Sequence, residues 1–258
     1  MSEAPLRGAG ILVTRPERQA EGLVAAIEAH GGVAIRFPVI EAQPIAQADV
    51  VATAATLQIP DIAILVSVNA VRYGLRFVGD ASVAVVGPAT ASAVQASGRE
   101  VDICAAGGFN SEQLLTTPEL QDVAGKVVRI IRGNGGRELL ANMLRERGAV
   151  VEYLEVYRRV RPDYDAAEIA AICDQWRAGA IAAVTVLSVE TLKNLVELLP
   201  AEGLELLGKT RLVTPARRVI KAANNRFPGI PTLLAEGPQA GDLVEAIVAG
   251  MQPGNPDD

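Results

Sequence analysis

The chain has 258 residues, a net charge of −6 and no Lys- or Arg-rich run, so nothing in it suggests a nucleic-acid-binding surface. Half of the residues are hydrophobic but only 3% are aromatic, an aliphatic balance that suits parallel sheets covered by Ala-rich helices. No apolar stretch reaches the length of a membrane span, and the N-terminus lacks the apolar core of a signal peptide. We therefore expect a soluble, cytoplasmic α/β protein.

Short β-branched runs alternate with segments of helical periodicity, which predicts parallel sheets flanked by helices. The expected strands are Ile11–Val13, Val33–Val39, Ile62–Val66, Val83–Val86, Val101–Ala105, Val127–Ile131, Val150–Val156, Ile181–Val186, Arg211–Val213 and Thr232–Ala235. The expected helices are Pro16–Ala29, Ala46–Leu57, Ser67–Arg76, Ala89–Ser97, Ser111–Thr116, Asp165–Arg177, Val189–Leu198, Arg217–Asn224 and Ala240–Gly250, with one more through Leu139–Leu144.

One sequence pattern occurs twice in the chain. Ile11–Glu41 lies without a gap on residues 128–158, so that Arg15 falls on Arg132 and Gly31 on Gly148. Later segments repeat with small register changes, and Ser67 falls on Ser188. Similarity at so long a period predicts two duplicated lobes of about 110–130 residues rather than a solenoid.

Two glycine-containing motifs are weak. Gly203–Thr210 satisfies the phosphate-loop pattern, but it runs from a helix into a strand instead of the reverse, so we do not expect it to bind phosphate. The Gly133–Gly136 run follows a strand but has Glu138 at the third glycine position of a dinucleotide fingerprint. An anion-binding loop at the start of the next helix remains open for that run.

The metal-binding residue types are scarce. His30 is the single histidine and is expected as a solvated residue at a helix end. Cys104 and Cys173 match no metal or redox spacing, and we expect two reduced, buried thiols. No metal site or histidine-based triad is therefore predicted, and chemistry must use Tyr, Ser, Thr, Arg, Lys or carboxylates.

Polar residues cluster just beyond the predicted strand ends, where open α/β sheets bind their ligands. The candidates are Arg15, Ser67, Asn69, Gly87, Thr90, Ser111, Gly133, Arg137, Ser188, Arg217 and Arg218. Each alone is more simply explained as a helix cap. Together, as hydroxyls, free amides and guanidiniums, they favour a polyanionic ligand. Tyr157 stands apart on the other strand of its unit, where a half-buried strand tyrosine is the simplest interpretation.

Six motifs follow one another in a specific order. They are ILVTRP at Ile11–Pro16, LVSVNAVRY at Leu65–Tyr73, VVGPATASAV at Val85–Val94, GFNSEQLL at Gly108–Leu115, IIRGNGGRELL at Ile130–Leu140 and GAVVEYLEVYRR at Gly148–Arg159. With these motifs the chain resembles the uroporphyrinogen-III synthase family from end to end. The resemblance implies two α/β lobes with the active site in the cleft between them. The implied lobes are residues 1–37 with 158–258 and residues 42–155, joined by connector strands near 33–41 and 150–158. The repeat itself fits two sequential domains equally well.

The resemblance also implies a reaction: cyclisation of hydroxymethylbilane to uroporphyrinogen III with inversion of the last ring, without metal or organic cofactor. Tyr157 matches the family's strand tyrosine, expected to assist loss of the substrate's hydroxyl, and Ser67, Thr90 and Ser188 match hydroxyls that face substrate carboxylates. Where many members carry a threonine in the second half, this chain has Arg217, and Arg217 or Arg218 could take its place.

The expected partners follow from that reaction. They are the polycarboxylate substrate, no nucleic acid and no membrane, for a monomer that could receive substrate from the preceding pathway enzyme. The alternative is a non-catalytic two-lobed binding or sensor module for an anionic, tetrapyrrole-like ligand.

Overall fold

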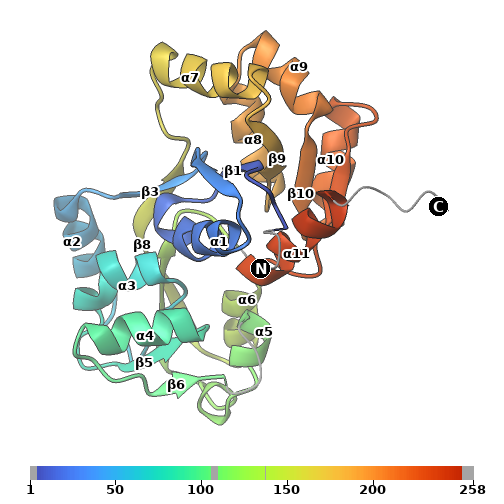
Figure 1. Cartoon of the computed structure of the whole chain (residues 1–258). Helices are drawn as coiled ribbons and strands as arrows, with labels where there is room; N and C mark the ends of the chain where they lie inside the picture. Colours follow the sequence, from blue (N-terminus) through green and yellow to red (C-terminus); the bar gives the residue numbers. More distant parts are fainter. Residues whose placement is uncertain (1–4, 106–109, 137, 252–258) are drawn as a thin grey trace. The chain divides into compact units, whose positions relative to one another are not determined.

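The computed structural model describes residues 5–105, 110–136 and 138–251 (Figure 1). The chain divides into two compact units. Unit 1 is discontinuous and consists of residues 1–41 and 161–258, whereas unit 2 is the continuous segment 42–160. Within the described residues no helix is long and apolar enough to cross a membrane.

Unit 1 is built on a five-stranded sheet in the order β11-β10-β9-β1-β2. Its strands are β1 (Gly10–Val13), β2 (Val33–Arg36), β9 (Ile181–Thr185), β10 (Arg211–Thr214) and β11 (Thr232–Leu234), and every pair is parallel. β1 lies between β2 and β9, with Leu12 paired to both Ile35 and Val184. The first strand of the chain therefore shares its sheet with strands from the last third.

Helices cover both faces of this sheet, so its central strand β1 is apolar and buried throughout, whereas β2 and β10 each carry an arginine at one end. The helices are α1 (Glu17–Ala29), α7 (Ala166–Arg177), α8 (Val189–Leu198), α9 (Ala201–Lys209), α10 (Arg217–Arg226) and α11 (Ala240–Met251). Ile11 and Val13 pack with α1 and α11, and Leu12, pointing the other way, packs with α7 to α10. The period-2 alternation of β1 thus divides the core of unit 1 into two layers.

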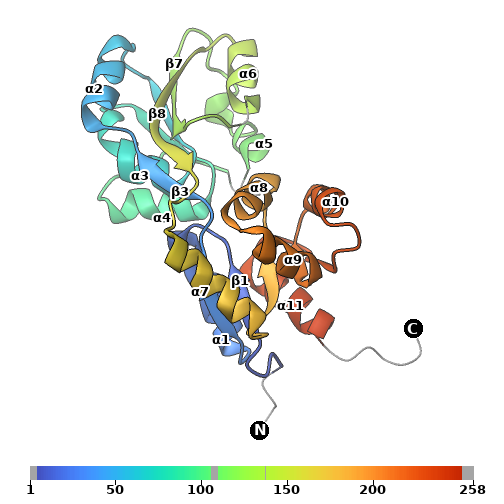
Figure 2. The ribbon, with the colours of Figure 1, turned by 90° about the horizontal axis from the view of Figure 1, so that it is seen from above.

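Unit 2 contains a six-stranded sheet in the order β3-β8-β7-β4-β5-β6. The strands are β3 (Glu41–Pro44), β4 (Ile62–Leu65), β5 (Ser82–Val85), β6 (Ile103–Cys104), β7 (Val127–Gly133) and β8 (Val150–Val160). The helices are α2 (Gln47–Thr56), α3 (Val68–Gly74), α4 (Pro88–Ala96), α5 (Ser111–Leu114) and α6 (Leu139–Glu146), with 3₁₀ turns at Leu75–Phe77 and Pro118–Leu120. α2, α3 and α4 pack on one face and α5 and α6 on the other, and Figure 2 shows α3 and α6 on opposite sides of β8.

The predicted parallel sheets flanked by helices are confirmed, and most boundaries agree to within two or three residues. The predicted strand Val33–Val39 is too long, because ladder pairing ends at Arg36 although Phe37 and Val39 remain buried. β8 was predicted too short: it continues past Val156 because Tyr157 still pairs with Gly133. β3 and α9 were not predicted at all.

Candidate active site

The carboxyl edge of the unit 2 sheet collects several predicted residues. The pairs β5–β6, β4–β5, β4–β7 and β7–β8 are all parallel, so these strands end at the same edge. Ser67 follows β4, Gly87 and Thr90 follow β5, Ser111 begins the helix after β6, and Gly133 ends β7. The structure therefore places these residues along one edge of the sheet.

Tyr157 on β8 reaches the same edge. Its side chain is buried, with 3% of its surface exposed, rather than half-buried as a strand tyrosine would be by default. Its hydroxyl lies 3.1 Å from the Oγ atom of Ser67. Ser67 caps α3, because its Oγ accepts a hydrogen bond of 3.1 Å from the Ala70 amide. The Ser67 proton is then free for donation to the phenol oxygen, which would leave the Tyr157 proton available to a ligand.

Gly133 makes room for the tyrosine ring. The two residues are paired across β7 and β8. A Cβ atom on Gly133 would lie 2.5 Å from Cε2 and 2.6 Å from Cζ of Tyr157, closer than carbon atoms can approach. The absence of a side chain at Gly133 therefore leaves the space that the Tyr157 ring occupies beside β7.

A pocket of about 340 Å³ opens beside Tyr157. Its polar lining comprises Ser111, Arg132, Tyr153, Tyr157, Arg159 and the backbone around Gly133–Gly136. Arg159 forms no ion pair with the described residues, so its charge is available to an anion. Arg132, Tyr153 and Arg159 were missed by the sequence analysis. Arg132 lies within β7, and Tyr153 and Arg159 lie within β8. From the sequence alone, charged and aromatic residues inside a strand are expected on its solvent-exposed face.

Arg132 and Tyr153 form one wall of this pocket. The Arg132 guanidinium lies 3.7 Å from the centre of the Tyr153 ring and 3.0 Å from a carboxylate oxygen of Glu138. The Tyr153 hydroxyl also donates to Glu138. These hydrogen bonds, first from Tyr153 and then from Arg132, lower the pKa of Glu138. Burial, followed by the bond to Glu138, raises the pKa of Tyr153, so this phenol stays neutral.

The remaining predicted residues of unit 2 are less directly placed. Thr90 is buried in the first turn of α4, and Asn69 is half-buried in the first turn of α3. Ser111 is not the cap of α5: Asn110 is, accepting 2.8 Å from the Gln113 amide, and its strong preference for that position could have identified it. Arg137 lies outside the described residues.

Unit 1 carries a second set at the carboxyl edge of its own sheet. Arg15 follows β1, Ser188 follows β9 and Arg217 follows β10, three adjacent strands. Ser188 caps α8 by accepting 3.0 Å from the Thr191 amide, as its duplicate Ser67 caps α3. The Ser188 hydroxyl also lies 2.8 Å from the Thr191 hydroxyl, whereas the Ser67 hydroxyl lies next to the hydroxyl of Tyr157.

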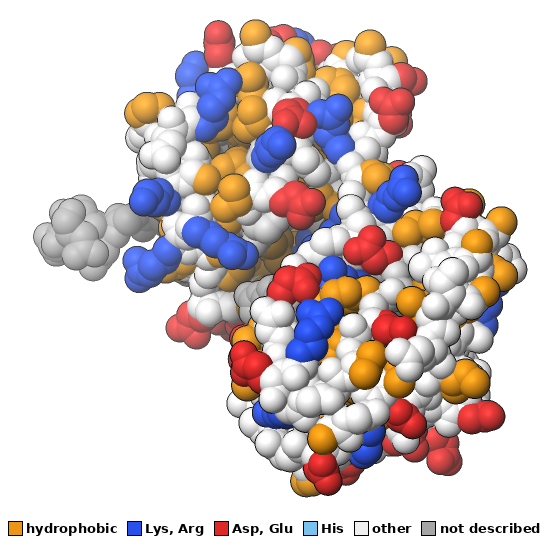
Figure 3. Space-filling view, turned by 180° about the vertical axis from the view of Figure 1, so that it is seen from behind, with side chains coloured by type: hydrophobic (Ala, Val, Ile, Leu, Met, Phe, Trp, Pro, Cys, Tyr) orange, Lys and Arg blue, Asp and Glu red, His pale blue; other side chains and the backbone are white. Residues whose placement is uncertain are grey.

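The arginines of unit 1 differ in whether other groups of the protein already bind them. Arg15 donates a hydrogen bond to the Pro238 carbonyl, and burial lowers the pKa of its guanidinium. Arg217 and Arg218 are exposed in the first turn of α10, next to a helix N-terminus that attracts anions. On the face of the molecule in Figure 3, acidic and basic side chains are interspersed.

Other expectations about single residues are settled by the structure. Cys173 is buried, but Cys104 is exposed at the end of the edge strand β6, so the expectation of two buried thiols is wrong for Cys104. His30 caps α1, with its Nδ1 2.8 Å from the Ala26 carbonyl. Residues Gly203–Lys209 of the phosphate-loop pattern lie inside α9, where the backbone forms a helix and no loop. Across the described part of the chain, no group of three or more His, Cys, Asp or Glu is placed to hold a metal ion.

The family model described as Uroporphyrinogen-III synthase HemD matches residues 21–245. The uroporphyrinogen-III synthase of Escherichia coli (strain K12) is 35% identical over 223 residues, which cover 83% of this chain and 89% of that protein. The chain belongs to the uroporphyrinogen-III synthase family. The predicted family is thereby confirmed, and with it a cyclising lyase of haem biosynthesis.

Solved structures of the uroporphyrinogen-III synthase family share the fold. The uroporphyrinogen-III synthetase from Helicobacter pylori 26695 superposes with a TM-score of 0.62 at 13% identity, covering 93% of this chain and 99% of that one. A mutant uroporphyrinogen III synthase from Thermus thermophilus gives 0.55 at 20% identity, covering 95% and 99%. At these identities the likeness concerns the α/β fold alone.

Proposed function

We propose that this uroporphyrinogen-III synthase binds hydroxymethylbilane and cyclises it to uroporphyrinogen III, with Tyr157 as the group that assists loss of the terminal hydroxyl. The observation that carries this assignment is the contact between the Tyr157 hydroxyl and Ser67 Oγ, at the carboxyl edge of a parallel sheet. A buried phenol held by a serine beside a pocket has the position of a proton donor.

The first step needs a proton at the oxygen of the terminal hydroxymethyl group. The C–O bond of the hydroxymethyl group breaks as Tyr157 hydrogen-bonds or transfers its proton to the departing oxygen, which leaves as water. The substrate remains as an azafulvenium cation, and loss of its pyrrole N–H proton gives the neutral azafulvene. The last pyrrole ring then attacks through its substituted carbon, and the resulting spiro intermediate fragments and recloses with that ring inverted. Because the substrate closes without inversion in the absence of protein, the main task of the site is to hold the two reacting carbons together.

The substrate's carboxylates need cations and donors. We assign this role to Arg15, Arg217 or Arg218 in unit 1, and to Asn69, Thr90 and Ser111 with the amides of Gly87 and Gly133 in unit 2. Ser188 and Arg137 complete the set by their match to the family pattern. Support comes from the placement of the described members at the carboxyl edges of the two sheets and from the exposed guanidiniums there.

The family resemblance, rather than the geometry of either unit, supports the finer organisation. In it, residues 1–37 with 158–258 and residues 42–155 form two lobes, with connector strands near 33–41 and 150–158 and the substrate between the lobes. The protein would act as a cytoplasmic monomer that receives substrate from the preceding enzyme of the pathway.

The test is an isomer analysis. Freshly prepared hydroxymethylbilane is supplied, the products are oxidised, and the uroporphyrin isomers are separated. We expect isomer III, and isomer I alone at the uncatalysed rate would refute the function. Tyr157→Phe is expected to slow isomer III formation by about 10²-fold or more, the usual share of a general acid. The matched control is Tyr73→Phe, in the same unit, whose hydroxyl donates only a long hydrogen bond of 3.5 Å to the Ala42 carbonyl.

A further inference from the structure

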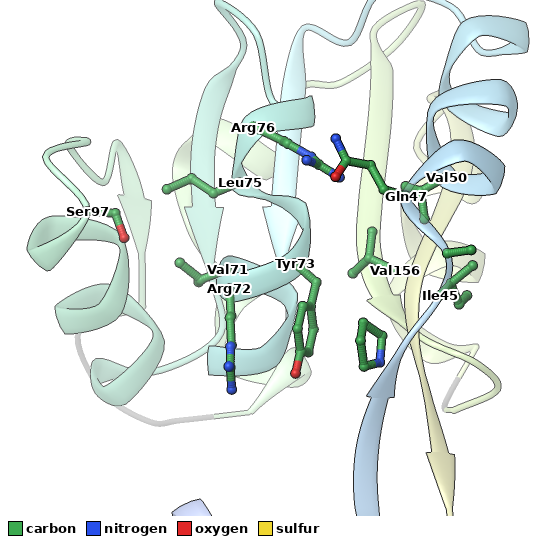
Figure 4. Close-up of a pocket in the computed structure, with 12 residues that line it drawn as sticks. Ile45, Gln47, Val50, Val71, Arg72, Tyr73, Leu75, Arg76, Ser97 and Val156 are labelled. Atoms are coloured by element: carbon green, nitrogen blue, oxygen red, sulfur yellow. The ribbon is translucent and has the colours of Figure 1, made fainter.

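A second, larger pocket lies in unit 2 on the helix-covered flank of the sheet. Its volume is about 870 Å³, and it is bounded by α2, α3 and β8 (Figure 4). It shares no lining residue with the pocket beside Tyr157. The reaction proposed above makes no use of it.

The floor of this second pocket is apolar. Val50, Val71 and Val156 are buried there, and Ile45 and Leu75 extend the surface on either side. Figure 4 shows Val156 between the side chains of α3 and those of the turn that leads into α2. Pockets of this size and lining bury an apolar body, and the few polar groups at their rim decide which one.

The rim is cationic. Arg72 and Arg76 are one helical turn apart and both exposed. Their guanidiniums lie 5.2 Å and 4.7 Å from the ring centres of the adjacent Tyr73 and Phe77. Neither forms an ion pair or hydrogen bond with the residues that the structure describes. None of the 12 lining residues is acidic, although the whole chain has 30 Asp and Glu against 24 Lys and Arg.

Neutral polar groups complete the rim. Figure 4 shows the Gln47 amide and the Arg76 guanidinium extending toward one another across the pocket, so one ligand group could contact both. The Tyr73 ring forms a side wall next to Arg72. The donors of a guanidinium lie in one plane, the arrangement that binds carboxylate and sulfonate oxygens.

We propose that this pocket is a binding site for an amphipathic anion: an aromatic or aliphatic body that covers the valine floor, with one or two acidic groups that reach Arg72 and Arg76. The site is distinct from the proposed reaction centre and does not depend on that assignment. The proposal rests on complementarity. The pocket has an apolar floor, two arginines without ion-pair partners among the described residues, and no carboxylate in its lining. Such a lining suits an amphipathic anion and does not suit a cation.

The test uses 1-anilinonaphthalene-8-sulfonate, an aromatic anion that fluoresces when it leaves water. The whole chain is titrated with it, and with N-phenyl-1-naphthylamine, which has the same aromatic body and no acidic group. We expect saturable binding of the sulfonate that weakens about tenfold in the double variant Arg72→Gln/Arg76→Gln, since two exposed ion pairs together contribute about one factor of ten. The neutral probe should bind the wild type and the double variant equally.

Two matched variants locate the site. Arg226→Gln removes an exposed arginine that also lies over a ring, that of Phe227 at 5.0 Å, but in unit 1. Arg159→Gln removes a cation of the pocket beside Tyr157. Neither should weaken sulfonate binding. The double variant removes two exposed arginine–ring contacts but no ion pair among the described residues, so its melting temperature should fall by no more than a few degrees and the variant should stay folded.

Three results would overturn the proposal: no saturable sulfonate binding, unchanged affinity in a folded double variant, or an equal loss of affinity in Arg226→Gln or Arg159→Gln. The last would place the probe elsewhere. The outcome is separable from the isomer assay, since sulfonate binding could fail in a fully active enzyme and could succeed in an inactive one.

Discussion

Gly133→Ala tests whether the position of the Tyr157 ring matters for the reaction. The new Cβ would lie 2.5 Å from Cε2, and an ordinary contact begins near 3.4 Å, so either the ring or the strand must move by about 0.9 Å. Both partners are constrained, because Gly133 is paired in the ladder and Tyr157 is buried.

The displacement has two measurable consequences. Inserting a methyl group into a packed region costs about 1–3 kcal/mol of stability. A ring shift of that size away from Ser67 would stretch the 3.1 Å contact between the Tyr157 hydroxyl and Ser67 beyond hydrogen-bonding range. A misplacement of about 1 Å near a reacting group can cost on the order of a hundredfold in rate.

The assay is the initial rate of isomer III formation, measured at a temperature where circular dichroism shows the variant folded. Gly22→Ala is the control, because Gly22 lies in α1 and an added methyl group would meet nothing within 4 Å. It should leave the rate unchanged with a small gain in stability. Wild-type rate and melting temperature in Gly133→Ala would show that the ring tolerates displacement, and the proposed role of Tyr157 would lose its geometric basis.

Two further predictions concern Ser67 and Tyr164. Ser67→Ala should lower the free energy of unfolding by about 1 kcal/mol through loss of the α3 cap. It should slow turnover when introduced into the wild type, but should slow it no further when introduced into Tyr157→Phe. If the two effects on the rate multiply, the serine acts independently of Tyr157. Burial, with smaller contributions from Glu168, Glu17 and Glu41, raises the pKa of Tyr164 to about 12. The folded state thus favours the neutral phenol, so its contribution to stability is complete below pH 10 and lost as the pH rises toward 12. An ultraviolet titration should show a last tyrosine ionising near pH 12, a step absent in Tyr164→Phe; simultaneous ionisation of all four tyrosines near pH 10 would contradict this.

The sequence predicted elements better than it predicted their pairing. Periodicity located α8 at Val189–Leu198 to the residue, because the serine cap and the apolar stripe are both local signals. β3 could not be found in that way: Glu-Ala-Gln-Pro has little strand preference and is a strand because it lies beside β8. The pairing of β1 with β9 is equally non-local, which is why the repeat fitted more than one chain path.

Strand ends were a good guide to the candidate site, and side-chain environment was not predictable. The rule that ligands bind at carboxyl ends selected Ser67 and Gly133, and the structure places both beside Tyr157. No local sequence pattern predicts that Arg15 donates a hydrogen bond to the Pro238 carbonyl or that the Arg132 guanidinium lies over the Tyr153 ring. Both contacts depend on side-chain packing between segments that are distant in the sequence.

The discontinuity of unit 1 has a consequence during synthesis. Unit 2 is complete when residue 160 has emerged, but β1 waits for β9, which begins at Ile181. At about 5–20 residues per second, that wait is on the order of ten to thirty seconds. During that time β1 can already pair with β2 and pack against α1, but the edge of β1 that pairs with β9 and the side of α1 that packs on α11 have no partner. The middle of the chain can already fold. A circularly permuted gene that joins residues 161–258 directly to 1–41 would remove the delay, and the nascent chain should then depend less on chaperones.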